Sequence, residues 1–224
     1  LKFENSAALG TDSSGNSNTF TVVGTPTQSP DSPTNVFTTL NPLDAYYTNS
    51  TFSNGNLTFA SGSSYLGTLA NILLDTGKWY WEVKPISKDG DTDNYVIGIQ
   101  GAPSTATNQF AGYHISHGYQ YYGQSGQIWS NGSGAAYGNT YTAGDIIGVA
   151  LDLDNNKLYF SKNGTFQNSG VPTSGSTGTG AQSITAPGSV TLGGYYPSQS
   201  FWSSSSATLS MNFGSGFFGT TAVA

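Results

Sequence analysis

The chain has 224 residues, enough for one large domain or for one domain with an extension. Its 6 lysines face 12 acidic residues, there is no arginine, and the net charge is −6, so it lacks the clustered cations that nucleic acids and anionic membranes require. No cysteine and no apolar run long enough to span a membrane occur, which excludes disulfides, thiolate chemistry and membrane insertion.

The composition predicts a fold made of many short strands. The chain holds 30 glycines and 13% aromatic residues, while charged residues are only 8%. Glycine-rich turns between aromatic and β-branched runs are typical of all-β domains. Because the chain begins at Leu1, we expect it to be a processed or partial piece of a longer polypeptide.

Residues 1–49 are predicted to form an N-terminal strand-and-loop extension that packs on the main domain. Asp12–Asn16 is rich in turn formers, and Phe20–Val23 is β-branched and strand-like. Three prolines between Thr25 and Pro33 exclude regular structure there.

Residues 50–224 are predicted to form the main β domain. In residues 79–84 the side chains alternate between two faces, as in a strand. Trp79, Trp81 and Val83 share one face, and Tyr80, Glu82 and Lys84 share the other. Tyr95, Ile97 and Ile99 form the next inward-facing set. Ser169–Ser189 is a low-complexity Gly/Ser/Thr segment, which we expect to be a long, mobile, exposed loop.

Gly144–Gly164 carries the pattern of a complete β-hairpin. Apolar residues recur at every second position from Ile147 to Leu153, as one buried strand face requires. Asp154–Asn156 supplies turn chemistry, and Leu158–Phe160 resumes the alternation. Asn163-Gly164 then marks a second tight turn.

This hairpin resembles the central hairpin of the SPRY domain family, a β-sandwich used mainly for protein recognition. Gly77–Val83 (GKWYWEV) resembles an early strand of that family, and Met211–Gly214 (MNFG), followed by Phe217, resembles its closing strand. The resemblance covers about residues 50 to 220 in the family's order. It implies an all-β antiparallel sandwich of the SPRY, concanavalin A-like jelly-roll type, in which loops at the rim carry specificity.

A second resemblance lies in the first 45 residues. Asp12–Asn16 (DSSGN), Asp31–Asn35 (DSPTN) and Leu40–Leu43 (LNPL) resemble segments that precede a SPRY-like domain in phage structural proteins. Asp12–Asn16 also resembles a loop of laminin-G-like sandwiches. The alternative interpretation is a polar turn that packs an edge strand onto the sandwich.

Aromatic residues supply the candidate binding surface. Tyrosine and tryptophan stack on sugars and anchor protein interfaces, although in strands about half of them point into the core. Tyr121 and Tyr122 are adjacent, as are Tyr195 and Tyr196, so we expect at least one of each pair to face solvent or a partner. The candidate ligand-binding residues are His117, Tyr119, Tyr121, Tyr122, Trp129, Tyr195, Tyr196 and Trp202.

Metal binding has one candidate cluster. Asp89, Asp91 and Asp93 offer the oxygen ligands that calcium favours, but the run departs from an EF-hand loop, and a solvated hairpin tip is the alternative. A zinc site at His114 and His117 would need further ligands. We therefore predict no resident cofactor, with calcium as the one alternative.

Catalysis is not favoured by the motifs present. No Gly-x-Ser-x-Gly elbow occurs, and a glycosidase would need a second carboxylate facing Glu82, whose position matches a structural acid in the SPRY family.

Together the two resemblances predict a non-catalytic recognition module of a phage virion protein. It would lie on a tail or capsid fibre, exposed on the virion surface and thus extracellular, as an adhesin for host attachment. Its partners would be a receptor protein or a carbohydrate on the host cell surface and other virion subunits. A purely structural virion domain that mediates subunit packing is the first alternative, and a carbohydrate-active enzyme is the second.

Overall fold

The computed structural model describes residues 5, 7–26, 36–44, 50–61, 67–88, 93–103, 117–201, 207–218 and 221–222. The chain divides into two compact units, Leu1–Val36 and Phe37–Ala224. The second unit begins before the predicted boundary at residue 50, and Leu40 is fully buried in its core. The predicted packing of residues 1–49 on the sandwich stays a prediction.

The first unit contains the predicted polar turn. The Asp12 carboxylate accepts hydrogen bonds from the backbone N–H groups of Ser14 and Asn18, both at 2.8 Å. Phe20–Val23, predicted as a strand, is irregular. A strand needs a ladder of backbone hydrogen bonds, and the bond from the Phe20 N–H to the Gly10 carbonyl, at 2.9 Å, does not make one.

The second unit is an antiparallel β-sandwich, as predicted, and its larger sheet has eight strands among the described residues. The spatial order is β1-β2-β14-β4-β9-β10-β11, with β12 also paired to β10. These strands are β1 (Ser50–Ser53), β2 (Thr58–Ser61), β4 (Lys78–Lys88), β9 (Ile147–Asp152), β10 (Lys157–Lys162), β11 (Thr165–Phe166), β12 (Gln182–Ser183) and β14 (Ala207–Asn212).

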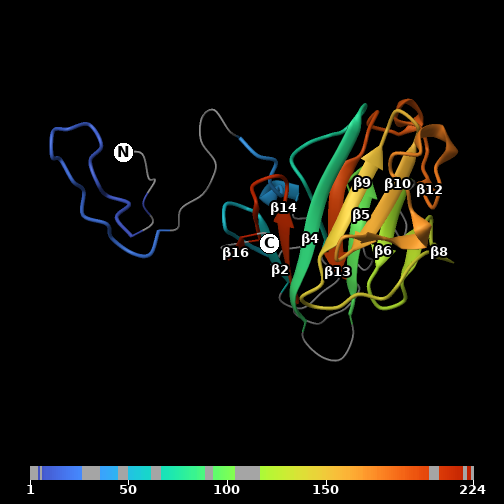
Figure 1. The fold of residues 1–224 in the computed structure, drawn as a ribbon, viewed down its shortest axis with the longest axis horizontal. Helices are drawn as coiled ribbons and strands as arrows, with labels where there is room; N and C mark the ends of the chain where they lie inside the picture. The colour runs from blue at the N-terminus through green and yellow to red at the C-terminus, as the bar shows by residue number, and fades with distance from the viewer. Residues whose placement is uncertain are drawn as a thin grey trace. The chain divides into compact units, whose positions relative to one another are not determined.

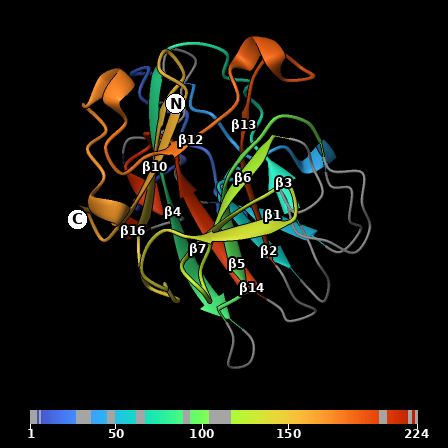
Figure 2. The same ribbon diagram turned by 90° about the vertical axis from the view of Figure 1, so that its right-hand side faces the viewer.

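The smaller sheet has six strands in the order β3-β13-β5-β6-β7-β8. They are β3 (Gly67–Leu69), β5 (Tyr95–Gln100), β6 (Gly118–Tyr122), β7 (Gln127–Ser130), β8 (Ser133–Ala136) and β13 (Tyr196–Phe201). A separate pair joins β15 (Phe217–Phe218) to β16 (Thr221–Ala222). Figures 1 and 2 show β4, β9 and β10 side by side in one layer, with β13, β5 and β6 in the other.

Helical structure in the described residues is limited to short 3-10 turns: η1 (Pro42–Asp44), η2 (Gln167–Ser169), η3 (Gly175–Thr177) and η4 (Pro187–Ser189). None of the helices in the described ranges is both long and apolar enough to cross a membrane. The segment Ser169–Ser189, predicted as a loop, contains η3, β12 and η4, and β12 pairs with β10.

The predicted hairpin is confirmed and forms the centre of the larger sheet. β9 pairs with β10 from Ile147↔Lys162 to Asp152↔Lys157, and its other edge pairs with β4. Asn163 and Gly164 both have positive φ (49° and 79°), as a tight turn of this type requires.

The core lies between the two sheets and is rich in aromatic rings. Tyr121 of β6 packs against Phe160 of β10, with ring centroids 5.2 Å apart, so this contact joins the sheets. The buried Tyr141 hydroxyl lies 2.8 Å from the carbonyl of Tyr121 and 3.1 Å from that of Tyr95, so its one proton is shared between a carbonyl of β6 and a carbonyl of β5.

Charged residues are distributed unequally between the sheets. The six strands of the smaller sheet contain no Asp, Glu, Lys or Arg, whereas β4, β9 and β10 all contain them. On the outer face of the larger sheet Lys78 forms an ion pair with Asp152, whose side chain is 5% exposed. Burial alone would raise the pKa of Asp152, but hydrogen bonds from Lys78 and Asn155 outweigh it and lower that pKa.

We expect Tyr141→Phe to destabilise the second unit by about 1–3 kcal/mol, because buried hydrogen bonds to backbone carbonyls are lost. Urea unfolding measures the change. Tyr80→Phe, at a side chain that is 54% exposed, is the matched control and should change stability by less than about 0.5 kcal/mol. An effect of Tyr141→Phe as small as the one expected for Tyr80→Phe would show that the Tyr141 hydroxyl has no structural role.

The ion pair predicts a pH dependence. Because the folded pKa of Asp152 lies below its ordinary value of 3.8, its stabilisation is present above that value and is lost as the pH falls through the folded pKa. Asp152→Asn should therefore be less stable than wild type at neutral pH, and the difference in unfolding free energy should shrink on acidification. Asp154→Asn, at an exposed carboxylate 3.7 Å from Lys78, is the control, and we expect it to change the unfolding free energy only slightly. A difference for Asp152→Asn that does not change with pH would contradict this account.

Candidate functional site

A groove lies on the outer face of the larger sheet, across β4, β9 and β10. The strand register places Tyr80 of β4 opposite Ala150 of β9, and Ala150 opposite Tyr159 of β10. Directly paired residues point to the same face of a sheet. Leu151 and Trp81 point inward to the core, so Ala150 and its partners must point outward.

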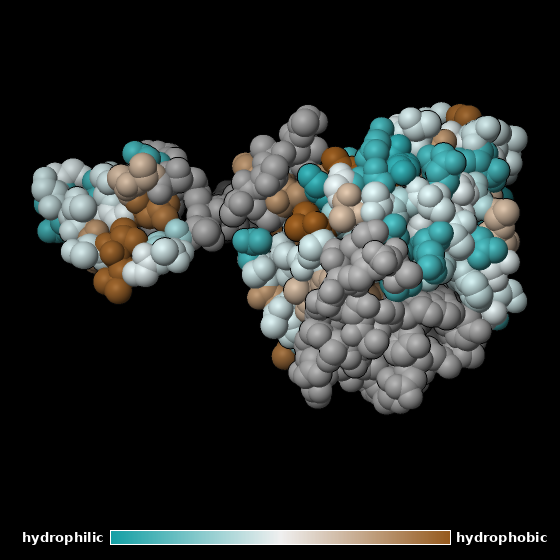
Figure 3. All heavy atoms as spheres, turned by 90° about the horizontal axis from the view of Figure 1, so that it is seen from below, coloured by the Kyte–Doolittle hydropathy of each residue, from teal (hydrophilic) through white to brown (hydrophobic). Residues whose placement is uncertain are grey.

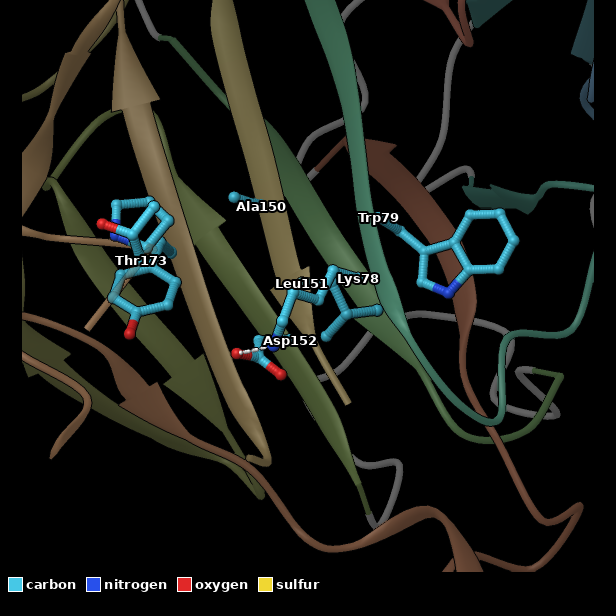
Figure 4. Close-up of a pocket in the computed structure, with 8 residues that line it drawn as sticks. Lys78, Trp79, Ala150, Leu151, Asp152 and Thr173 are labelled. Atoms are coloured by element: carbon cyan, nitrogen blue, oxygen red, sulfur yellow. Dashed lines mark ion pairs between the residues drawn. The ribbon is translucent and has the colours of Figure 1, made fainter. Parts of the chain in front are cut away.

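The groove is small and mainly apolar. It has a volume of about 180 Å³ and is lined by Lys78, Trp79, Ala150, Leu151, Asp152, Tyr159, Pro172 and Thr173. Figure 4 shows Thr173 on one side and Lys78 with Asp152 on another, while the Trp79 ring points away from them.

The wall of the groove comes from the segment that follows η2. Tyr159 is fully buried, and its hydroxyl lies 3.3 Å from the Ser174 hydroxyl, which ties this segment to β10. Pro172 and Thr173 therefore stand over β10, while Ala150 on the neighbouring strand is only partly covered. The methyl group of Ala150 thus forms the open part of the groove.

One rim of the groove is charged. Lys78 bonds to Asp152 and lies 3.7 Å from Asp154, and the Lys78 and Asp154 side chains are 58% and 52% exposed. The hydrogen bond to Asp152 raises the pKa of Lys78. The rim therefore presents fixed charges of both signs beside an apolar floor.

Tyr80 lies on the same face of β4 as Lys78, two residues along the strand, and is 54% exposed. The ring leans over Gly148, where an added Cβ would lie 2.5 Å from the Tyr80 hydroxyl and 2.4 Å from the Ser161 hydroxyl. Burial and the charge of Glu82 raise the pKa of Tyr80 to about 12, so its hydroxyl stays protonated at neutral pH and donates to Glu82 at 3.0 Å.

Glu82 is held as a structural acid. Its second carboxylate oxygen accepts a hydrogen bond from Asn212 Nδ2 at 3.1 Å. Both oxygens are thus bonded to neighbouring side chains on the sheet, which is the role that the family resemblance implied for this position.

The size of the groove indicates what it can hold. Sites for small molecules are typically roughly 300–1,000 Å³, so this groove fits a single apolar side chain better than a substrate. No group of three or more His, Asp or Glu residues suited to a metal ion occurs in the described ranges. In the face shown in Figure 3, hydrophobic residues of the second unit lie in separate spots.

Most of the predicted binding tyrosines are core residues. Tyr119 and Tyr195 are 7% and 0% exposed, and their rings pack edge to face at 6.2 Å. Both hydroxyls bond to Thr185: the Thr185 N–H donates to Tyr119 at 3.0 Å, and Tyr195 donates to the Thr185 carbonyl at 2.7 Å. Their bonds fasten the segment between β12 and η4 to the smaller sheet.

The expectation that Tyr121 or Tyr122 faces solvent is wrong. The two side chains do point to opposite faces, but they are 0% and 6% exposed, because both faces of β6 are buried. Tyr122 packs with Val96 and Trp129 on the outer face, and its hydroxyl, which has one proton to donate, lies 2.8 Å from Asn94 Oδ1 and 2.6 Å from Gln124 Oε1.

The remaining predicted residues are dispersed. Trp129, Tyr196 and His117 are partly exposed, on β7, on β13 and before β6. Trp202, His114, Asp89 and Asp91 lie outside the described residues, while Asp93 accepts a hydrogen bond from the Thr142 hydroxyl at 2.7 Å. The binding role of the aromatic set and the calcium alternative stay predictions.

Sequence reasoning missed the residues that form the groove. Lys78 carried a usable signal, because it shares the face of Tyr80 and Glu82, which must be the solvent face. Pro172 and Thr173 carried none, since they lie in a segment whose composition indicates an exposed loop.

The chain is similar to Ran-binding proteins of animals. It is 41% identical over 90 residues to Ran-binding protein 9 of Danio rerio, which covers 39% of this chain and 14% of that protein. The human Ran-binding protein 9 is 40% identical over 90 residues, covering 39% and 12%. The Ran-binding proteins 9/10 homolog of Drosophila melanogaster is 37% identical over 105 residues, covering 46% and 11%. The matched segment is thus a small part of each relative.

These relatives contradict the predicted biological setting. The expectation of a phage tail or capsid fibre on the virion surface, with host attachment as its function, is wrong, because the matched relatives are animal proteins. The same correction applies to the alternative of a structural virion domain and to virion subunits as partners. The error came from the resemblance of short motifs in the first 45 residues to segments of phage structural proteins. The similarity to the Ran-binding proteins covers less than half of the chain.

Solved structures share the fold. The SPRY domain of human HERC1 matches with a TM-score of 0.61 at 19% identity, covering 78% of this chain and 98% of that one. A second human SPRY domain matches with a TM-score of 0.55 at 14% identity, covering 75% and 96%. The sequence model of the SPRY domain matches residues 78–215, which contain β4, β9, β10 and the groove. The chain therefore belongs to the SPRY domain family.

Proposed function

We propose that this chain is a non-catalytic protein-recognition domain that binds a segment of a partner polypeptide in the groove across β4, β9 and β10. SPRY domains mediate protein–protein interaction, which supplies the class of ligand. The observation that carries the choice of site is the partly exposed methyl group of Ala150 beside the wall formed by Pro172 and Thr173.

The occupant is one apolar side chain of the partner, with its main chain crossing the rim. Tyr159, Pro172 and the methyl group of Ala150 offer apolar contact, which is favourable where water is displaced. Lys78 and Asp154, both largely exposed, lie at the rim as a hydrogen-bond donor and an acceptor for polar groups beside that side chain. Hot spots of protein interfaces combine such an anchor pocket with a polar rim.

Ran is a defined probe, because the relatives are named for binding it. Ran that binds wild type but not a groove variant would place that interaction in the groove. Ran that does not bind the chain would assign the property to the parts of the relatives that lie outside the matched segment.

We expect Ala150→Glu to weaken binding of partner peptides at least about tenfold, because a carboxylate would fill the groove and would be desolvated by the incoming side chain. Linear peptides selected on wild-type protein from a displayed random library are the ligands, and fluorescence polarisation measures their affinity. Ala186→Glu, which adds the same charge at an exposed position, is the matched control and should bind as wild type does.

The groove is rejected as the site if every selected peptide binds Ala150→Glu with wild-type affinity. Protein recognition by this chain is rejected if the library yields no peptide and Ran does not bind. Urea unfolding of Ala150→Glu separates a loss of binding from a loss of folding.

A further inference from the structure

β8 forms an open edge of the neutral sheet. It is the last strand in the order β3-β13-β5-β6-β7-β8, so one of its sides pairs with β7 and the other has no neighbouring strand among the described residues. All four of its residues, Ser133–Ala136, are exposed. Sheet edges of this kind are templates for strand addition unless they are protected.

Charge, proline and a bulge, which are three of the usual protections of an edge, are absent from β8, although the strand is short. Natural edge strands carry lysine, other charges, proline or a bulge. The sequence of β8 is Ser-Gly-Ala-Ala, its register with β7 is regular, and residues 94–144 contain no Asp, Glu, Lys or Arg. An incoming strand would therefore desolvate no charged group of β5 to β8.

The register identifies the backbone groups that are available. Asn131 and Gly132 form a two-residue turn with positive φ at both positions (48° and 74°), and Ser130 pairs with Ser133 beside it. Hydrogen-bonded and non-hydrogen-bonded pairs then alternate along the hairpin, so Ala135 bonds to β7. The N–H and C=O groups of Gly134 and Ala136 consequently point to the open edge.

A tryptophan ring lies over the same edge. Trp129 pairs with Gly134, and a Cβ added at Gly134 would lie 2.8 Å from Trp129 Cε2 and 3.1 Å from Cζ2. The missing side chain at Gly134 lets the ring lie across β8. The ring is partly exposed and packs below against Val96 and Tyr122, so its position is fixed.

We propose that β8 is a second recognition surface, at which an extended, uncharged segment of a partner polypeptide adds as a further strand. The Gly134 and Ala136 backbone groups give the hydrogen bonds, and an apolar side chain opposite Gly134 contacts the Trp129 ring, because paired residues point to the same face. The proposal shares with the proposed function only the class of ligand, a polypeptide.

The test uses the complete 224-residue chain and the displayed library of random linear peptides, selected in parallel on wild type and on Ala150→Glu. Ala136→Pro removes the outward N–H and leaves the bonds of Ala135 to β7, since proline is tolerated at the solvent side of an edge strand. Ala136→Ser keeps the N–H and is the matched control. Peptides of the β8 class should bind Ala150→Glu and Ala136→Ser like wild type and bind Ala136→Pro at least about tenfold more weakly.

Amide hydrogen exchange gives an independent readout on the wild-type protein. In the free chain the amides of Gly134 and Ala136 should exchange fast and that of Ala135 slowly, and a β8-class peptide should protect the first two. The proposal is overturned if selection on Ala150→Glu yields no peptide, or if its peptides bind Ala136→Pro equally well or leave Gly134 and Ala136 unprotected. Failure of the groove instead appears when every peptide selected on wild type binds Ala150→Glu equally well, so the two failures are distinguishable.

Discussion

The contact between Tyr121 and Phe160 is the interaction on which the architecture depends. It joins β6 of one sheet to β10 of the other with ring centroids 5.2 Å apart. The rings of Tyr137 and Tyr141 pack around the Tyr121 ring, with centroids 5.8 Å and 5.0 Å from it. Aromatic rings of this size fill the space between two packed sheets. With both inner faces occupied in this way, recognition is left to the outer faces and the sheet edges.

The unequal distribution of charge gives the two outer surfaces different chemistry. β4 and β9 place Lys78 and Asp152 beside an apolar groove, so a ligand there meets an anchor position with a polar rim. The smaller sheet has no charged residue in its strands and ends in β8, which offers backbone groups and the Trp129 ring. We therefore propose that one small domain binds two kinds of polypeptide segment, one through a side chain and one through its main chain.

Much of the fold could be predicted from the sequence, because alternation along β9 and β10 is a local signal. The site could not. Alternation shows that Tyr121 and Tyr122 point to opposite faces, but only the tertiary structure shows that both faces of β6 are buried. Pro172 reaches the groove through contacts distant in sequence, which composition does not encode. The short motifs of the first 45 residues were associations, and they gave the wrong biological setting.

The central claim is that a partner polypeptide binds the outer face of the larger sheet. Amide chemical-shift mapping of isotope-labelled protein, titrated with a peptide selected on the wild-type chain, tests it most directly. The account predicts that the perturbed amides include Lys78, Ala150 and Thr173, which come from β4, β9 and the wall segment and line the groove. The claim is contradicted if every peptide selected on the wild-type chain binds saturably and leaves all three amides unperturbed.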